Sequence, residues 1–130
     1  MRQGHDLIGQ AETGSGKTGA YGIPLVERLD PTVRAPQVLV LVPTRELALQ
    51  VAEDLRALGR ERGITAVALF GGQPIERQIT ALRRRSHIVV ATPGRMLDHM
   101  QRGTVTLGAV AVTILDEADR MLDMGFLPDV

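Results

Sequence analysis

Residues 11 to 18 read Ala-Glu-Thr-Gly-Ser-Gly-Lys-Thr, a glycine-rich stretch that ends in a lysine and a threonine. Glycines at this spacing let several backbone N–H groups point at one anion, and a following helix adds the positive end of its dipole. In such a loop Lys17 reaches the β- and γ-phosphates of a nucleotide, and the Thr18 hydroxyl can bind Mg²⁺. The stretch therefore predicts a phosphate-binding loop. An ordinary glycine turn before a helix is the simpler alternative, and Ala11 stands where the usual pattern begins with glycine.

Lys17 is the only lysine in the chain, because every other one of the 15 basic residues is an arginine. The guanidinium group is a wide planar fork that suits carboxylates and exposed phosphates, whereas a tight loop needs a compact ammonium. The lysine supports the phosphate loop, with chance in an arginine-rich composition as the alternative.

The second chemical motif is the acidic cluster Asp116-Glu117-Ala118-Asp119, which follows the apolar stretch 110–115. Downstream of a phosphate loop, an aspartate in this place binds Mg²⁺ through water, and the adjacent glutamate orients or deprotonates the attacking water. Acidic residues also stabilise the N-terminus of an ordinary helix. Paired with Lys17 and Thr18, the cluster indicates the second half of an ATPase site.

These motifs need a scaffold that brings them together. Short apolar stretches typical of buried strands occupy residues 6–9, 37–42, 65–70, 87–91 and 110–115. Stretches with helical spacing lie between them, at residues 20–29, 45–62, 74–84, 92–100 and from 120 onward. Strands that alternate with helices predict an α/β fold with a right-handed, doubly wound parallel sheet. In such sheets ligands gather at the carboxyl ends of the strands, where the motifs lie.

Several local features bear on these helices. Pro24 allows a kink or an early end of the first helix, and Thr44 is a reasonable N-cap for the second. Arg83-Arg84-Arg85 closes the third, where a solvated helix end and a nucleic-acid patch both stay open. Met96, Leu97 and Met100 are expected to pack rather than to act. The histidines His5, His87 and His99 lack metal-ligand spacing and are expected to be surface or core imidazoles.

Composition sets limits on partners. The chain has 130 residues, 44% hydrophobic and 23% charged, which suits one globular domain at most. Its formal net charge is zero, so binding to nucleic acid needs a local patch. It has no cysteine, which excludes disulfides and zinc–thiolate sites. No apolar stretch approaches the ~18 residues of a membrane span, so we expect a cytoplasmic protein. Only 2% of the residues are aromatic, so we do not expect the protein to bind nucleic acid by stacking bases on aromatic rings.

Further motifs follow the predicted strands, and together in chain order they resemble those of the DEAD-box ATP-dependent RNA helicases. The resemblance covers essentially the whole chain, and alanine at position 11 is usual in that family. The motifs that carry it are residues 11–18, 43–48 (Pro-Thr-Arg-Glu-Leu-Ala), 71–72 (Gly-Gly), 92–95 (Thr-Pro-Gly-Arg), 116–119 and 120–126.

The resemblance implies a P-loop NTPase domain of the RecA-like type, with residues 1–130 as a partial N-terminal RecA-like (helicase ATP-binding) domain, incomplete at both ends. The family's adenine-reading glutamine motif is expected upstream of residue 4. Its Ser-Ala-Thr motif is expected beyond Val130, on a strand between the phosphate-loop strand and the Asp-Glu strand, so the sheet is expected to have an unfilled slot. A second RecA-like domain is expected to supply an arginine finger, and residues 1–130 alone are expected to be inactive.

The resemblance also assigns roles to residues, with ATP and Mg²⁺ as cofactors. It implies that Glu117 and Lys17 are catalytic, that Thr18 and Asp116 hold the metal, and that Asp119 links the nucleotide site to a later motif. It implies nucleotide contacts from Ala11, Thr13, Gly14, Ser15, Gly16, Lys17, Thr18, Asp116, Glu117 and Asp119. The RNA phosphates are expected at Pro43, Thr44, Arg45, Gly71, Gly72, Thr92, Pro93, Gly94 and Arg95.

Contacts to the nucleic-acid backbone carry no sequence information, so RNA binding is expected to be largely sequence-independent. The resemblance implies that the complete protein couples ATP hydrolysis to local unwinding of RNA duplexes. Two alternatives stay open. One is a related helicase motor that acts on DNA. The other is a non-catalytic or degenerate piece that binds nucleic acid or a protein partner.

Overall fold

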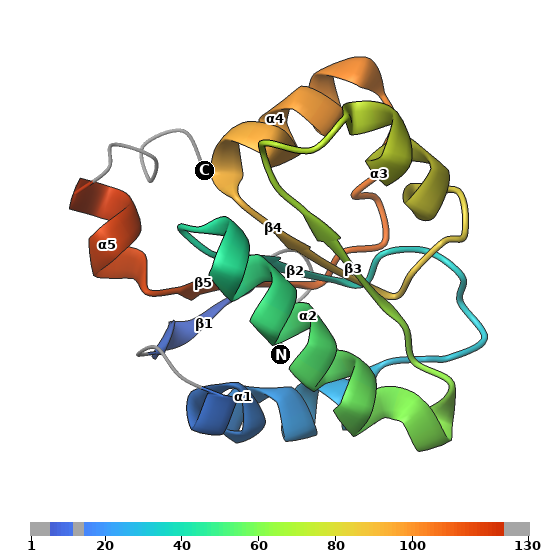
Figure 1. Ribbon diagram of the computed structural model, residues 1–130. Coiled ribbons are helices and arrows are strands. Elements are labelled where there is room, and N and C mark those ends of the chain that lie inside the picture. Colours follow the sequence, from blue (N-terminus) through green and yellow to red (C-terminus); the bar gives the residue numbers. More distant parts are fainter. Residues whose placement is uncertain (1–5, 12–14, 124–130) are drawn as a thin grey trace.

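The computed structural model describes residues 6–11 and 15–123 of the chain (Figure 1). Strands and helices alternate along it, as the spacing of the apolar stretches predicts. The elements are β1 (Asp6–Ala11), α1 (Ser15–Arg28), β2 (Val38–Leu41), α2 (Arg45–Gly59), a 3₁₀ turn (Arg60–Arg62), β3 (Ala66–Leu69), α3 (Ile75–Leu82), β4 (Ile88–Ala91), α4 (Pro93–Arg102), β5 (Val112–Asp116) and α5 (Ala118–Asp123).

The strands form one parallel sheet in the order β1-β5-β2-β4-β3. Strands β2, β4 and β3 begin in register with one another, since Val38 pairs with Ile88, and Ile88 pairs with Ala66. The last residues are level too, so the segments that follow the strands all leave from one edge. The prediction of a doubly wound parallel sheet is confirmed.

Helices cover both faces of this sheet, which explains the continuous apolar stretches in the strands. Helices α1 and α2 lie on one face, and α3 and α4 lie on the other (Figure 1). Along β2, Val38 and Val40 pack in the core beneath α1 and α2, while Leu39 and Leu41 belong to the core on the opposite face. Met121 of α5 joins that second core.

The expected empty slot between β1 and β5 is not present. These strands pair directly, with Ala11 opposite Asp116, and the register shifts between Leu7 and Gln10. An open strand edge leaves N–H and C=O groups unpaired, and direct pairing satisfies them. That expectation is therefore wrong for the described part of the chain.

Helix boundaries differ from the sequence pattern in ways that local chemistry explains. Pro24 does not end α1, which continues to Arg28. Pro24 is exposed, so water can bind the carbonyl group that the missing N–H leaves unpaired. The N-cap prediction is confirmed, because the Thr44 hydroxyl accepts a hydrogen bond from the backbone N–H of Leu47 at 3.2 Å. In the described residues, no helix is long and apolar enough to cross a membrane.

Candidate functional site

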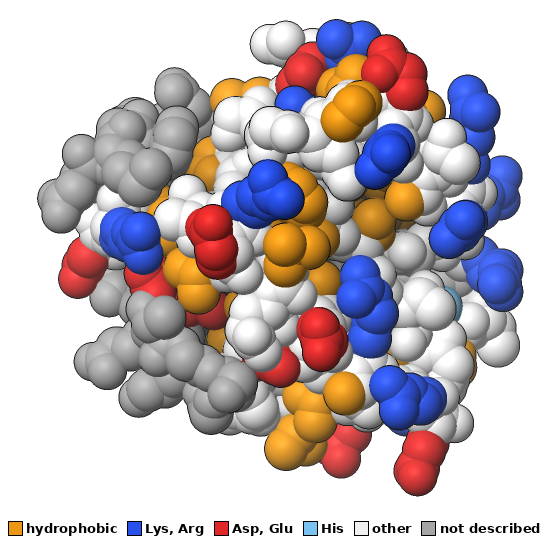
Figure 2. Space-filling model, viewed as in Figure 1, with side chains coloured by type: hydrophobic (Ala, Val, Ile, Leu, Met, Phe, Trp, Pro, Cys, Tyr) orange, Lys and Arg blue, Asp and Glu red, His pale blue; other side chains and the backbone are white. Residues whose placement is uncertain are grey.

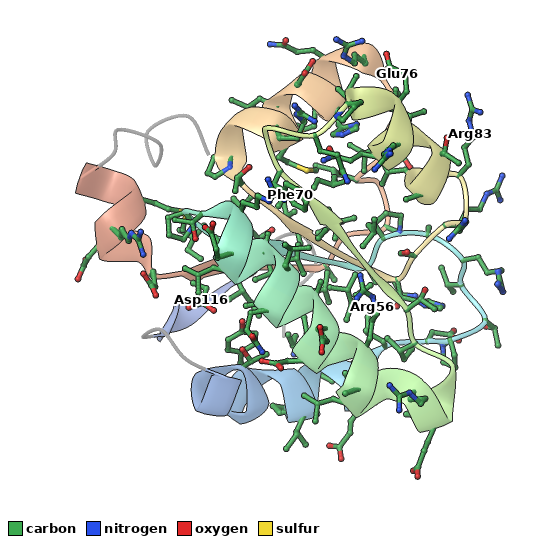
Figure 3. All side chains as sticks on the ribbon, in the orientation of Figure 1. Arg56, Phe70, Glu76, Arg83 and Asp116 are labelled. Carbon is green, nitrogen blue, oxygen red and sulfur yellow. The ribbon has the colours of Figure 1, made fainter. Side chains whose placement is uncertain are left out.

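The carboxyl edge of the sheet gathers the motifs that the sequence singles out. Residues 43–45 follow β2, residues 71–72 lie just beyond β3, residues 92–95 follow β4, and residues 116–119 lie at the end of β5. Phe70, after β3, and Asp116, the last residue of β5, are labelled in Figure 3. Parallel strands of matched register therefore bring segments that are far apart in sequence to one side of the molecule.

The phosphate loop has the expected strand–loop–helix setting, since β1 ends at Ala11 and α1 begins at Ser15. Thr13 and Gly14 lie outside the described residues. For Ala11, Ser15, Gly16 and Lys17 the structure describes the backbone only. Thr18 is the first residue of this motif with a described side chain, and it is almost completely buried.

Asp116 is buried at the carboxyl end of β5, with an exposed fraction of 3%. Its Oδ2 accepts a hydrogen bond from the Tyr21 hydroxyl at 2.8 Å. Its Oδ1 is buried and has no hydrogen-bond partner among the described residues. Burial raises the pKa of Asp116 above its ordinary value, and the charge of Glu117 acts in the same direction, while the Tyr21 hydrogen bond opposes them.

Tyr21 lies on α1, one turn after Thr18, with its ring in the core between α1, α2 and the sheet. Burial, followed by the negative charge of Asp116, raises the pKa of Tyr21 far above its ordinary value, and a hydrogen bond with Thr18 acts against them. The hydroxyl therefore keeps its proton and donates a hydrogen bond to Asp116. Sequence analysis included Tyr21 only within the helical stretch 20–29; the missed signal is that a buried tyrosine hydroxyl needs a partner.

Glu117 follows directly and adopts a left-handed backbone conformation, with φ of 60°. Such a conformation is uncommon for a residue with a side chain and is typical of functional sites. Its Oε1 contacts Arg120 Nη1 at 3.3 Å, and its Oε2 is buried without a hydrogen-bond partner among the described residues. Asp119 is exposed on α5.

These oxygens fit a magnesium–nucleotide complex. Mg²⁺ prefers oxygen ligands, keeps several waters, and is usually held by one or two carboxylates together with substrate phosphates. Among the described residues, no group of three or more His, Cys, Asp and Glu side chains could hold a metal ion by itself. The buried Asp116 oxygen and the Thr18 hydroxyl match the sparser donor set that a phosphate-bound ion needs.

The candidate RNA-binding loops also contact one another. The Arg45 guanidinium lies over the Phe70 ring, 5.3 Å from its centre. Gly72 has φ of 83°, and a Cβ at this position would lie 3.9 Å from Arg45 Nη1. Arg95 reaches the same loop, where its Nη1 donates to the Gln73 carbonyl at 3.0 Å. Both arginines, and the glycine turn between them, therefore form one surface.

Gln78 of α3 forms hydrogen bonds with these loops, and sequence analysis did not include it in the site. Its Nε2 donates to the Phe70 carbonyl at 2.7 Å and to Gln73 Oε1 at 2.9 Å. Its Oε1 lies 3.1 Å from Arg95 Nη1 and 2.9 Å from His99 Nε2. Both protons and both lone pairs of the amide are thus used. The missed signal was a glutamine at a buried position of the helical stretch 74–84, where an apolar residue is usual.

His99 is fully buried on α4 and completes this network. Since Gln78 Oε1 can only accept, His99 Nε2 carries the proton, and Nδ1 accepts from the Thr104 hydroxyl at 2.7 Å. Burial lowers the pKa of His99, so the neutral form is favoured. The packing prediction holds for Met96 but is wrong for Leu97 and Met100, which are 36% and 44% exposed, because the inward positions of α4 belong to Met96 and His99.

The arginines after α3 lie away from this surface. Arg83, Arg84 and Arg85 are exposed, and Arg83 and Arg85 line a cavity of about 370 Å³ together with Arg34. The cavity is built from segments that lead into β2, β4 and β5, so it lies toward the opposite edge of the sheet. Figure 2 shows basic side chains gathered on the right of the molecule, where Figure 3 places Arg83.

A doubly wound parallel sheet, with a glycine-rich motif after β1 and acidic residues at the end of β5, is the arrangement of the P-loop class of α/β domains. A family model described as DEAD/DEAH box helicase matches residues 1–130. The chain belongs to this family.

Relatives and solved structures agree. The ATP-dependent RNA helicase DeaD of Escherichia coli strain K12 is 55% identical over 131 residues, which cover 100% of this chain and 21% of that protein. The DEAD-box ATP-dependent RNA helicase CshA of Geobacillus kaustophilus is 52% identical, over 98% of this chain and 27% of its own length. The crystal structure of a DEAD box protein from Methanococcus jannaschii matches with a TM-score of 0.84 and 44% identity, covering 98% of this chain and 34% of that one. The chain thus has the RecA-like fold of these proteins and spans about a quarter of the curated relatives' length.

Proposed function

We propose that this chain binds Mg–ATP and the backbone of single-stranded RNA, and that the full-length protein couples ATP hydrolysis to local unwinding of RNA duplexes. The observation that carries the proposal is the pair of buried oxygens on Asp116 and Glu117 that have no hydrogen-bond partner among the described residues. Asp116 ends β5 and contacts Tyr21 of α1, and Glu117 follows it directly in the chain. A buried polar atom without a partner is costly, and a bound ligand relieves that cost.

On the nucleotide side, residues 13–18 and Lys17 in particular hold the phosphates. Thr18 and Asp116 hold the metal ion, which supplies charge neutralisation and orientation of the phosphates. Glu117 acts on the attacking water. Arg120 occupies one of its oxygens, so the free Oε2 is the atom that orients the water or accepts its proton.

On the RNA side, Arg45 and Arg95 supply positive charge, and the backbone N–H groups of residues 71–72 and 92–94 supply neutral donors for phosphate oxygens. The contacts of Arg45 with Phe70 and of Arg95 with Gln73 support this assignment, because they hold both charges on one surface. Contacts of this kind predict affinity for many RNA sequences.

We propose further that residues 1–130 are part of an N-terminal RecA-like domain that works with a second RecA-like domain. An arginine finger from a second domain or protein increases the rate of such reactions by about 10³–10⁵-fold. A cytoplasmic location stays a prediction.

The test uses the full-length protein. We expect Mg–ATP to bind, Lys17→Ala to weaken that binding, and single-stranded RNA to stimulate ATP hydrolysis more than DNA of the same sequence. Stronger stimulation by DNA would assign the motor to DNA. RNA binding without any hydrolysis would assign a non-catalytic role, and unchanged nucleotide affinity in Lys17→Ala would remove the phosphate-loop assignment.

A further inference from the structure

We propose that Tyr21 is a positioning residue of the magnesium–nucleotide site, whose hydroxyl fixes the Asp116 carboxylate so that one oxygen stays free for the ligand. The inference rests on the proposed function, and it adds a residue that sequence analysis did not include in the site. Tyr21 comes from α1 and Asp116 from the end of β5, 95 positions later, and the two side chains are 2.8 Å apart.

The position of Tyr21 is set by packing. Residues three apart on a helix share a face, so Tyr21 and Thr18 both face the carboxyl end of β5. The next residue, Gly22, holds α1 close to α2, because a Cβ there would lie 2.8 Å from Leu58 and 2.9 Å from Leu55. The ring is 9% exposed within the core beneath these helices. A tyrosine held in this way delivers its hydroxyl to one fixed point.

The hydroxyl determines which way the carboxylate faces. A carboxylate has two equivalent oxygens and a soft terminal torsion, so it needs an outside contact to fix its orientation. Among the described residues, Tyr21 is the only side chain that hydrogen-bonds Asp116. It occupies Oδ2 and leaves Oδ1 buried without a partner. Partners that orient a metal ligand from behind commonly change metal affinity by 10–100-fold when they are removed.

Thr18 lies one turn before Tyr21 on α1, and its side chain is almost completely buried. Tyr21 therefore shares a helix with one residue that is proposed to hold the ion, and its hydroxyl donates a hydrogen bond to the other. A phenylalanine would fill the same core volume, so the hydroxyl is the part of this residue that acts on the site.

The decisive variant is Tyr21→Phe in the full-length protein, because it removes one oxygen and keeps the ring. The probe is fluorescently labelled ADP, titrated at a series of Mg²⁺ concentrations and once in excess EDTA. We expect the affinity in EDTA to match the wild type, and the Mg²⁺ concentration for half-maximal binding to rise by about 10-fold or more. Mn²⁺ binding, followed by its paramagnetic resonance signal, is expected to weaken in parallel. An unchanged Mg²⁺ and Mn²⁺ dependence would overturn the proposal.

A double-mutant cycle separates positioning from simple packing. In an Asp116→Asn background, Tyr21→Phe is expected to have no further effect on the Mg²⁺ dependence, since the carboxylate it orients is gone. An additive effect there would overturn the proposal. Thr80→Ala removes a hydroxyl from α3, far from the site in the fold, and serves as the matched control. If the wild type itself shows no Mg²⁺-dependent nucleotide binding, the proposed function fails; if only the variant matches the wild type, Tyr21 alone loses its role.

Discussion

Two buried polar clusters lie near the carboxyl edge of this sheet, and they differ in how completely their hydrogen bonds are made. Around Gln78, both donors and both acceptor positions of the amide are used by Phe70, Gln73, Arg95 and His99. At the end of β5, Asp116 and Glu117 each keep one buried oxygen without a partner among the described residues. A saturated network fixes the shape of its surroundings, whereas unpaired oxygens leave room for something that is yet to bind.

The clusters also differ in the backbone beneath them. Gln78 lies in the regular part of α3, and the loops it joins are held by ordinary bonds such as that from the Thr92 N–H to the Leu69 carbonyl at 2.9 Å. Glu117 holds a left-handed conformation instead. Strain and unmet hydrogen bonds coincide at the acidic cluster, which is typical of sites organised for a ligand. The predictions below test this contrast.

The largest effect is expected from Glu117→Gln. The amide keeps the shape of the side chain but cannot accept a proton from water, so kcat for ATP hydrolysis by the full-length protein is expected to fall by about 10²–10⁴-fold. Nucleotide affinity is expected to stay the same. Glu76→Gln makes the same chemical change at an exposed position in the first turn of α3 and is the control for kcat. Normal turnover in Glu117→Gln would remove the acidic cluster from catalysis.

Gln78→Met tests the saturated cluster. Methionine fills a similar volume but leaves the Phe70 carbonyl and the Arg95 guanidinium without their partner, so the free energy of unfolding is expected to fall by about 2–3 kcal/mol. The Mg²⁺ dependence of nucleotide binding is expected to remain that of the wild type. Denaturant titration measures the first quantity and labelled ADP the second.

The control for that experiment is Gln50→Met, since Gln50 is exposed on α2 and is expected to change stability by no more than about 0.5 kcal/mol. A shift in the Mg²⁺ dependence caused by Gln78→Met would show that the two clusters are coupled, which contradicts the division between shape and ligand binding.

Much of this arrangement could be predicted from sequence. The apolar stretches, the glycine turns and the Thr44 cap carry local signals, and they predicted the strands, their parallel direction and the edge where the motifs gather. The position of Asp116 at the end of β5 followed from the same pattern.

The contacts across the sheet could not be predicted. Tyr21 and Asp116 meet only because α1 packs beside β5, and periodicity says nothing of where a phenol points. Gln78 and His99 occupy inward positions that normally hold apolar residues, and their bonds to one another depend on how α3 and α4 lie together. The pairing of β1 with β5 was likewise a tertiary outcome.

Asp116→Asn tests the unpaired oxygen of Asp116 through its effect on the free energy of unfolding. The raised pKa of Asp116 means that its ionised form is disfavoured in the folded state. Above the raised pKa, replacing the carboxylate by a neutral amide is therefore expected to raise the free energy of unfolding, by about 1–2 kcal/mol at pH 7 without nucleotide or Mg²⁺. Asp98→Asn is the matched control with the opposite sign, because Arg102 lowers the pKa of this exposed carboxylate. A loss of stability in Asp116→Asn would contradict the unpaired state of that oxygen.

The smallest effect is expected from protonation of His99, which links the saturated cluster to pH. Burial, and secondarily the charges of Arg95 and Arg102, lower the pKa of His99, while Asp98 acts in the opposite direction. As pH falls below the ordinary histidine pKa of about 6.5, His99 becomes protonated in the unfolded chain while it stays neutral in the folded chain. Stability is therefore expected to fall in this window, by at most about 1.4 kcal/mol per pH unit for one proton, and to level off once the folded form is protonated too.

His99→Gln identifies the source of that pH dependence. The glutamine amide can donate to Gln78 as His99 Nε2 does, but it does not titrate, so the difference in pH dependence between variant and wild type isolates this one imidazole. Denaturant titrations at pH 7, 6 and 5 provide the comparison. If the two proteins lose stability in parallel, His99 accepts its proton without disturbing the network, and the saturated cluster is looser than its hydrogen bonds imply. If only the wild type loses stability, the network around Gln78 is rigid enough to keep His99 neutral. That result is expected of a hydrogen-bonded cluster whose role is structural.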